Sequence, residues 1–309
     1  MTEASMIGLL VATVSFGALL YLAALGELIS EKAGVLNLGV EGMMAMGAVS
    51  AFMAAHQTGN PWIGLAVGVL AGALTGFLHG WFTVVLGAEQ VVSGLSLTIL
   101  GLGFAAYMGK NVVGRPPGGV LAPVDWGPLT DIPWAGPVLF GQAPFVYLAV
   151  LAGLATWFVL SRTRIGLALR AAGESASTAD AAGHSVVGLR LGAVVVGGGL
   201  AGASGAYLTL TLTPQWAEGI TAGRGWIALA LVVFASWRPS RVLLGAILFG
   251  GITILQLNAQ AAGLGIPGAF MSMLPYIATI VVLVLISRDA IRIRLNAPAC
   301  LGKPFRAER

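Results

Sequence analysis

The sequence predicts an all-α polytopic membrane protein with about nine (eight to ten) transmembrane helices, formed by one membrane domain over residues 1–309. Of the 309 residues, 57% are hydrophobic and only 9% are charged, whereas about a quarter of the residues in a soluble domain are charged. Several apolar runs approach the roughly 20 residues that a helix needs to cross a bilayer. Because backbone groups in lipid must pair within their own segment, these runs are expected to be helices.

The candidate spans are residues 7–26, 35–56, 62–86, 91–109, 144–160, 191–212, 225–237, 242–260 and 270–287. Segment 225–237 is too short to cross a bilayer alone. The residues before it are therefore expected to enter the membrane as well, so some helices should be discontinuous.

The basic residues predict an orientation with the N-terminus outside and the C-terminus in the cytoplasm. In this orientation thirteen of the 16 lysines and arginines lie on the inside, and only Lys110, Arg115 and Arg224 do not. The main connections are then an outside loop at 110–143, an inside loop at 161–190 and a cytoplasmic tail at 288–309. The excess of basic over acidic residues is therefore better explained by orientation in the membrane than by nucleic-acid binding.

The stretch GVLNLGVEGMMAMGA, residues 34–48, places Asn37 and Glu41 inside an apolar segment. Residues four apart share one face of a helix. A charge at the centre of a bilayer costs about 2.5–3.5 kcal/mol, so Glu41 is expected to face protein or water. Two interpretations stay open: these residues line a pathway, or Glu41 accepts hydrogen bonds from backbone or arginine and locks the bundle.

A second glycine-interrupted entry, GITAGRGWIALALVVF at residues 219–234, contains Arg224 and Trp226. It would run the opposite way across the membrane, as an inverted repeat would produce. Trp226 could stack on a base ring, or it could simply pack in the bundle.

Polar residues in the fourth span are further candidates for a pathway: Gln90, Ser93, Ser96 and Thr98. Their alternative role is hydrogen bonding between helices, which contributes about 0.6 kcal/mol for each bond.

The inside loop 161–190 is long for a bundle connection. It contains helix-forming residues from Leu167 to Ala172, then Gly173, then a second helical run from Ser175 to Ala182 that ends at Gly183. Ser175 suits the N-cap and Gly183 the position after the helix. We therefore expect a short helix lying at the membrane surface.

The sequence predicts neither a metal site nor a nucleotide site. His56, His79 and His184 lack the spacing of metal ligands, and no phosphate-binding G-x-x-x-x-G-K-[ST] motif occurs. An ion-coupled transporter would cluster acidic residues within its spans, where this chain offers mainly Glu41. A membrane enzyme would need paired carboxylates or histidines around one cavity, and the spans suggest none.

Five blocks of the sequence together resemble one transporter family. GLALRAAGESASTADAAGHS resembles the cytoplasmic coupling segment of ABC-importer permeases, in the branch that serves ribose-type sugars, branched-chain amino acids and nucleosides. The others are EKAGVLNLGVEGMMAMGA, EQVVSGLSLTILGLG, DIPWAGPVLFGQAPFVYLAV and TAGRGWIALALVVFASWRP. They follow the expected order between Glu31 and Pro239, and they look most like nucleoside permeases that work with a basic-membrane-protein-type binding protein.

The resemblance implies a permease fold of the type II ABC-importer kind, serving nucleosides or related nucleobases in a bacterial inner membrane. Permeases for simple sugars or branched-chain amino acids are the alternative, followed by an ion-coupled transporter. The implied partners are a homologous second permease in a heterodimer, a periplasmic or lipid-anchored substrate-binding protein, membrane lipid, and a cytoplasmic ATPase that binds ATP and magnesium. Nucleic acid is not among them, and the chain itself is not expected to be an enzyme or to hold a cofactor.

The resemblance also assigns contact with the ATPase to the inside loop, through Leu167, Arg170, Gly173, Glu174, Ala182 and Gly183. The chain departs from the family at two places. Ser175 and Ala176 follow Glu174 where Asn-Pro is common, and Glu89 stands where Asn is common.

Overall fold

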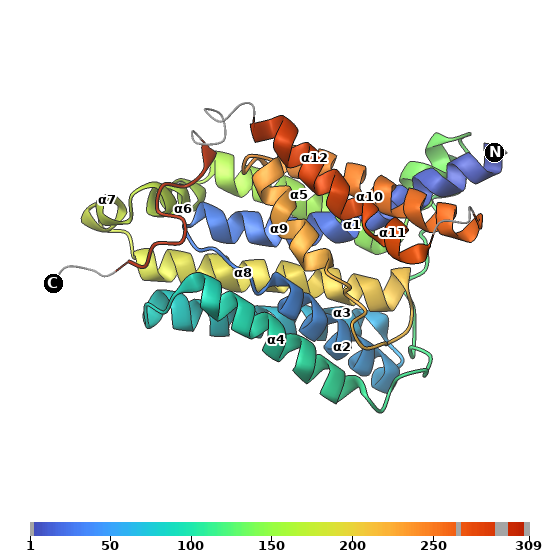
Figure 1. Ribbon diagram of the computed structural model, residues 1–309, viewed down its shortest axis with the longest axis horizontal. Coiled ribbons are helices and arrows are strands. Elements are labelled where there is room, and N and C mark those ends of the chain that lie inside the picture. Colours follow the sequence, from blue (N-terminus) through green and yellow to red (C-terminus); the bar gives the residue numbers. More distant parts are fainter. Residues whose placement is uncertain (1–2, 264–266, 288–295, 306–309) are drawn as a thin grey trace.

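In the computed structural model the chain forms a bundle of helices that lie mostly along one common direction (Figure 1). The structure describes residues 3–263, 267–287 and 296–305, and these ranges contain no strand. The helices are α1 (Glu3–Lys32), α2 (Val40–Thr58), α3 (Pro61–Gly80), η1 (Trp81–Val85), α4 (Gln90–Gly109), η2 (Gly127–Leu129), η3 (Gly136–Phe140), α5 (Pro144–Arg162), α6 (Arg164–Glu174), α7 (Ala176–Ala181), α8 (Val186–Tyr207), η4 (Leu208–Leu212), α9 (Arg224–Phe234), α10 (Pro239–Ala261), α11 (Gly268–Ser272) and α12 (Leu274–Ser287).

Six stretches of the described chain are long and apolar enough to cross a membrane: α1, α3 with η1, α4, α5, α8 with η4, and α10. All nine predicted spans fall on helices, but α9 has only 11 residues and the last span is divided into α11 and α12. A polytopic helical membrane protein is therefore confirmed, while the number of about nine spans stays a prediction.

Large differences from the expected spans lie where α1 ends and α2 begins. The first helix continues to Lys32, beyond the expected end at residue 26, and the second begins at Val40 rather than at residue 35. The chain turns between them at Gly34, which has φ +90°, a conformation that glycine adopts without steric cost. Residues 33–39, called the 33–39 segment below, thus lie between the two helices and belong to neither.

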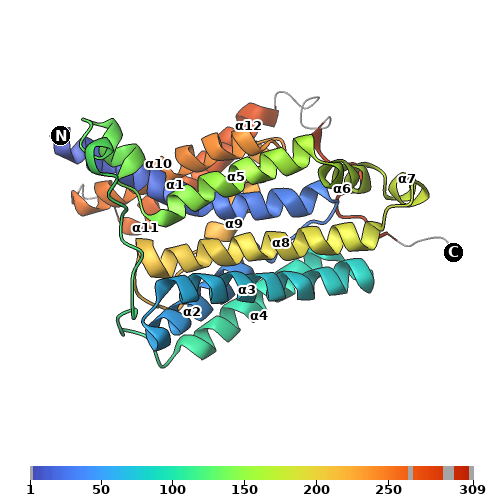
Figure 2. The same cartoon turned by 180° about the vertical axis from the view of Figure 1, so that it is seen from behind.

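Helix α8 lies at the centre of the bundle and packs against α1, α2 and α3 (Figures 1 and 2). Around Gly202, its contact with α3 is made by backbone atoms. A methyl group added at Gly202 would lie 2.4 Å from the carbonyl oxygen of Gly68 and 2.9 Å from Cα of Gly72. Small residues at such crossings let membrane helices approach closely and gain van der Waals contact.

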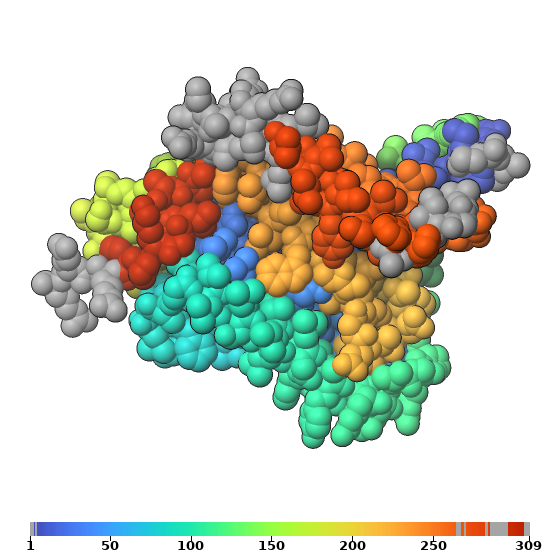
Figure 3. Space-filling model, viewed as in Figure 1, coloured from blue at the N-terminus to red at the C-terminus, as the bar shows by residue number. Residues whose placement is uncertain are grey.

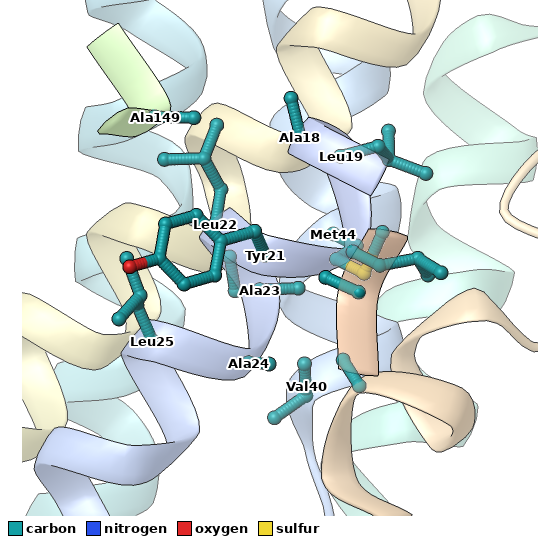
Figure 4. Packing of buried hydrophobic residues seen from close by; sticks show 14 of the residues in the cluster. Ala18, Leu19, Tyr21, Leu22, Ala23, Ala24, Leu25, Val40, Met44 and Ala149 are labelled. Carbon is teal, nitrogen blue, oxygen red and sulfur yellow. The ribbon is translucent and has the colours of Figure 1, made fainter. Parts of the chain in front are cut away.

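The apolar core extends from α8 to the side chains around α1. Figure 4 shows Leu19 of α1 on the side where Val40 and Met44 of α2 pack, while Leu22 lies toward Ala149 of α5. These side chains are at most 3% exposed, so α1 is enclosed along this part of its length.

The two ends of the bundle have different coverings. The 110–143 loop lies at the same end as the N-terminus, whereas α6, α7 and the described part of the tail lie at the other end (Figures 1 and 2). Within this loop, the Val124 N–H donates a hydrogen bond of 3.0 Å to the Gln142 carbonyl near the loop's end. The indole of Trp126 donates to the Tyr147 hydroxyl at 3.2 Å.

Replacing Gly202 with alanine should destabilise the bundle, because overpacking a tight contact costs about 1–3 kcal/mol or more. Thermal unfolding of the purified protein in detergent should show a lower midpoint. Gly103→Ala is the matched control, since a methyl group there meets no atom within 4 Å and alanine favours a helix by roughly 0.5–1 kcal/mol. Equal midpoints for the two variants would contradict the close contact between α3 and α8.

Candidate functional site

The 33–39 segment is held inside the bundle by polar side chains from α1 and α4. Glu27 accepts a hydrogen bond from the Asn37 backbone N–H at 3.0 Å, and Gln90 accepts one from the Leu36 N–H at 2.7 Å. Irregular backbone is tolerated at membrane depth only when protein or water satisfies its polar groups. These side chains do so here, and Gln90 therefore supports the segment.

Carbonyl groups of the same segment are satisfied from α3 and α4. The Thr98 hydroxyl donates to the Leu38 carbonyl at 2.9 Å. Nε2 of the fully buried His79 lies 3.1 Å from the Leu36 carbonyl, and its Nδ1 lies 3.1 Å from the Ser93 hydroxyl. Four helices (α1, α2, α3 and α4) thus meet around this segment.

Asn37 does not share a helix face with Glu41, and this expectation was wrong. The helix begins at Val40, three residues too late to include Asn37. The Asn37 side chain instead accepts from the Gly39 N–H at 3.0 Å and donates to the sulfur of Met43 at 3.4 Å. Its role is therefore to fold the turn that starts α2.

Glu41 binds the beginning of α9 with both carboxylate oxygens. Oε1 accepts from the Gly223 N–H at 2.8 Å and Oε2 from the Gly225 N–H at 2.6 Å. The side chain is 3% exposed. A carboxylate suits this place because the first N–H groups of a helix lack partners and carry positive partial charge. This is the hydrogen bonding that the bundle-locking interpretation of Glu41 requires.

The contact between α2 and α9 is close enough to require glycine. A methyl group at Gly225 would lie 2.6 Å from both N and Cα of Glu41. By chain order, α2 leads to the end of the bundle with the 110–143 loop, and α9 leads to the end with α6 and α7. Two helices of opposite direction therefore start beside one another, as an inverted pair would, and the inverted repeat itself stays a prediction.

Arg224 and Trp226 both lie at the start of α9, beside the contact with Glu41. The Arg224 guanidinium group lies 5.1 Å from the ring centre of Phe16 and donates to the Ile220 carbonyl at 2.5 Å. Trp226 is half-buried. The arginine thus folds back on its own loop and on α1.

A pair of buried acidic residues near the end of α1 was missed from the sequence. Glu27 and Glu31 are each 1% exposed, because α1 continues through what was taken for an inside loop. The Trp237 indole donates to Glu31. Ser236 and Trp237 have φ of +49° and +55°, which is strained backbone for residues with side chains. The four-residue spacing of Glu27 and Glu31, directly after an apolar run, was the signal in the sequence that could have revealed this acidic pair.

Beside the 33–39 segment, α4 and η1 form an open groove of about 400 Å³. It is lined by Phe82, Ala88, Glu89, Val92, Ser93, Ser96, Leu97 and Leu100. Of the four polar candidates in α4, only Ser93 and Ser96 reach it, and Ser96 is exposed.

In the centre of Figure 3, the blue N-terminal segments show only as small patches between the teal atoms of α4 and the orange atoms of the later helices.

Glu89 caps α4 at the rim of this groove. Its carboxylate accepts from the Val92 N–H at 2.6 Å and from the Val91 N–H at 3.1 Å. These two bonds hold the pKa of Glu89 below its ordinary value, because they stabilise the charged form. The change from the Asn common in the resembled family therefore preserves an N-cap.

The 161–190 connection forms two short helices, α6 and α7. Ser175 caps α7 by accepting from the Thr178 N–H at 3.4 Å, and Gly183 has φ +85°, so both predicted helix ends are confirmed. The expected break at Gly173 is wrong, because α6 continues to Glu174. Glycine is needed there for another reason: a methyl group would lie 2.2 Å from the Lys32 carbonyl oxygen.

Arg190 joins the elements at this end of the bundle. It is 2% exposed and donates to the carbonyl groups of Ala33 at 3.1 Å, Ala172 at 3.3 Å and Lys303 at 2.9 Å. The Cys300 N–H also donates to the Gly173 carbonyl at 2.9 Å. Sequence reasoning had used Arg190 only as an orienting charge.

The remaining residues assigned to the ATPase contact lie on the surface of α6 and α7. Leu167 is 61% exposed, and Arg170, Glu174, Ala182 and Gly183 are exposed. Residues 288–295 of the expected tail lie outside the described residues. Within the described ranges, no group of three or more His, Cys, Asp and Glu side chains could hold a metal ion.

Comparison with known proteins identifies the family of this bundle. The profile described as "Branched-chain amino acid transport system / permease component" matches residues 9–285. The chain belongs to this family of permeases. No solved structure matches it.

Curated relatives cover nearly the whole permease. It is 42% identical to the "Putative glucose ABC transporter permease protein TsgC13" of Haloferax volcanii over 97% of this chain and 98% of that protein. It is 33% identical to the nucleoside ABC transporter permease NupC of Lactococcus lactis, over 88% and 90% of the two chains. It is 32% identical to the guanosine ABC transporter permease NupQ of Bacillus subtilis, over 95% of each chain.

A second permease from each of these organisms also matches the chain. The identity is 25% in Bacillus subtilis, 23% in Haloferax volcanii and 22% in Lactococcus lactis. The protein is thus a multi-pass ABC transporter permease subunit. Such subunits are not themselves enzymes.

Glu41→Leu should destabilise this permease more than Glu41→Gln. Glutamine keeps one acceptor for the two N–H groups of α9, whereas leucine leaves both unpaired, and each unpaired buried group costs about 1–3 kcal/mol. Thermal unfolding should therefore rank wild type above Gln and Gln above Leu. Glu218→Gln is the control, since this carboxylate lies exposed in the loop before α9. A Glu41→Leu protein as stable as wild type would rule out the lock.

Proposed function

We propose that this permease forms, with a second homologous permease, the pathway by which an ATP-driven importer moves nucleosides or related nucleobases across the membrane. The groove along α4 carries the proposal. It combines the ring of Phe82, which is 47% exposed, with the hydroxyls of Ser93 and Ser96. An aromatic ring can stack on a base, and hydroxyls can bond to ribose. The names of two relatives specify nucleoside or guanosine.

A simple sugar is the second candidate solute, favoured by the 42% identity to a putative glucose permease. A hexose and a ribose share their hydroxyl groups, so the same groove suits both. Branched-chain amino acids fit less well. The eight residues that line the groove include one acidic side chain, Glu89, and no basic side chain. An α-amino acid would bring a carboxylate that needs a basic partner.

Uptake measurements should separate these solutes. In cells whose labelled-nucleoside uptake depends on this chain, unlabelled nucleosides should compete, whereas glucose and leucine should not. Ser96→Trp should reduce uptake at least tenfold by filling the groove, while Ile99→Trp on the same helix should not, since Ile99 is 74% exposed and does not line the groove. Competition by glucose alone would select the sugar, and equal uptake in both variants would remove the groove from the pathway.

The second permease is proposed to be a homologue rather than a second copy of this chain. The three organisms named above each carry one permease that is 32–42% identical to this chain and another that is 22–25% identical. Such pairs are expected where two different subunits line one pathway. A substrate-binding protein, periplasmic or lipid-anchored, would deliver the solute on the outside.

Helices α6 and α7 are proposed to dock on the cytoplasmic ATPase, which would bind ATP and magnesium. Under this proposal the N-terminus would lie outside, the C-terminus inside and the chain in the cytoplasmic membrane. Ile165 and Leu167 support the contact, because they expose 67% and 61% of their surface on α6. Gly173 and Arg190 fix α6 on the ends of α1 and α8, so movement of the ATPase would reach the segment after α1.

Leu167→Arg should leave insertion and folding intact and reduce co-purification of the ATPase. Burying an unpaired charge in an interface costs several kcal/mol, so a loss of at least tenfold is expected. Ile132→Arg is the matched control, because Ile132 is 41% exposed in the loop at the other end of the bundle. Undiminished ATPase binding and transport in Leu167→Arg would contradict docking through α6.

A further inference from the structure

A second groove lies on the opposite side of α1 from α2, where α1, α5 and α10 meet. Its volume is about 350 Å³. It is lined by Tyr21, Val150, Gly153, Leu154, Trp157, Pro239, Ser240 and Leu243. Most of these side chains are apolar, and Leu154 and Trp157 are 59% and 47% exposed. The groove therefore faces the surroundings of the bundle rather than its core.

The Tyr21 hydroxyl opens into this groove. Tyr21 is 5% exposed, and Figure 4 shows its ring extending from α1 away from Val40 and Met44. A methyl group at Gly153 would lie 2.0 Å from its hydroxyl oxygen, so the hydroxyl rests against the backbone of α5. Within the described part of the chain no hydrogen bond satisfies it. Buried hydroxyls of tyrosine usually have a partner, and a ligand in the groove would supply one.

Basic residues surround the end of the groove nearest α6. Arg162 is the last residue of α5, Arg238 precedes α10, and Arg241 lies in its first turn. Arg162 and Arg238 are exposed. Residues 157–166 and 235–245 contain no acidic side chain. Glu31 lies nearby through its bond to Trp237, but the three arginines outnumber it, so this end of the groove is positive.

We propose that this groove binds one anionic phospholipid. An acyl chain would lie along Val150, Leu154 and Leu243, and the phosphate would pair with the arginines. The Tyr21 hydroxyl would donate to an ester carbonyl. Gly153 precedes Arg162 by nine residues, or about 13 Å along a helix, which leaves room for a phosphate and a glycerol between them.

Charge distinguishes this site from ordinary lipid contact. Any apolar membrane face touches acyl chains, and those contacts do not select a headgroup. A basic residue near an anionic lipid surface contributes about 1 kcal/mol, or roughly a fivefold preference for each residue. The site should thus prefer phosphatidylglycerol to phosphatidylcholine, and the preference should depend on the arginines.

Tryptophan quenching can measure this preference, because Trp157 lines the groove. The full chain would be reconstituted in phosphatidylcholine vesicles that contain increasing fractions of dibrominated phosphatidylglycerol or of dibrominated phosphatidylcholine. The difference between wild type and Trp157→Phe isolates the Trp157 signal. Quenching by phosphatidylglycerol should reach its midpoint at a mole fraction at least fivefold lower than quenching by phosphatidylcholine.

Three variants complete the test. The triple variant Arg162→Gln, Arg238→Gln, Arg241→Gln should abolish the preference, and Tyr21→Phe should weaken phosphatidylglycerol quenching without changing the fold. Arg115→Gln, in the loop at the other end of the bundle, should change nothing. Equal quenching by both lipids in wild type would overturn the proposal, as would a preference that survives the triple variant. Absence of quenching by either lipid would also overturn it, since another surface would then cover the groove.

Discussion

The two hydrogen bonds from α9 to Glu41 are the constraint on which the centre of this permease depends. α2 and α9 both begin inside the bundle, so their first N–H groups point into protein rather than water. One carboxylate joins the two starts, with bonds of 2.8 and 2.6 Å. Its position in turn requires the 33–39 segment to be folded, because Asn37 shapes the turn that leads to α2. A charge that would be costly in lipid therefore joins the start of α9 to the start of α2.

Composition and apolar runs were enough to predict a helical membrane bundle, and the ends of α7 followed from the cap residues Ser175 and Gly183. These features are local, so the sequence nearby determines them. The roles of Gln90, Thr98 and His79 were not predictable, since each depends on a segment about 40 to 60 residues away. Asn37 was misplaced because the start of α2 depends on tertiary contacts. Glu27 and Glu31 were missed because charge was read as a sign of a loop, although buried partners extend α1 past them.

The end of the bundle near α6 is a single junction rather than a set of loops. Arg190 contacts α6, the residue after α1 and the described tail at once. The Gly173 carbonyl is held by the tail, and its Cα lies close to Lys32. A force applied to α6 would therefore act on α1 and on the 33–39 segment directly after it. Packed elements with few rearrangements transmit such displacements well, because cores are not continuously deformable.

The shortness of α9 has a consequence for how the protein is made. Its 11 residues are about 17 Å long, too short to partition into a bilayer as an independent helix. The N–H groups at its start are paired by Glu41, which is synthesised some 180 residues earlier. Stable insertion of α9 therefore depends on α2, which is synthesised first, so the order of synthesis supplies the partner before the helix that needs it.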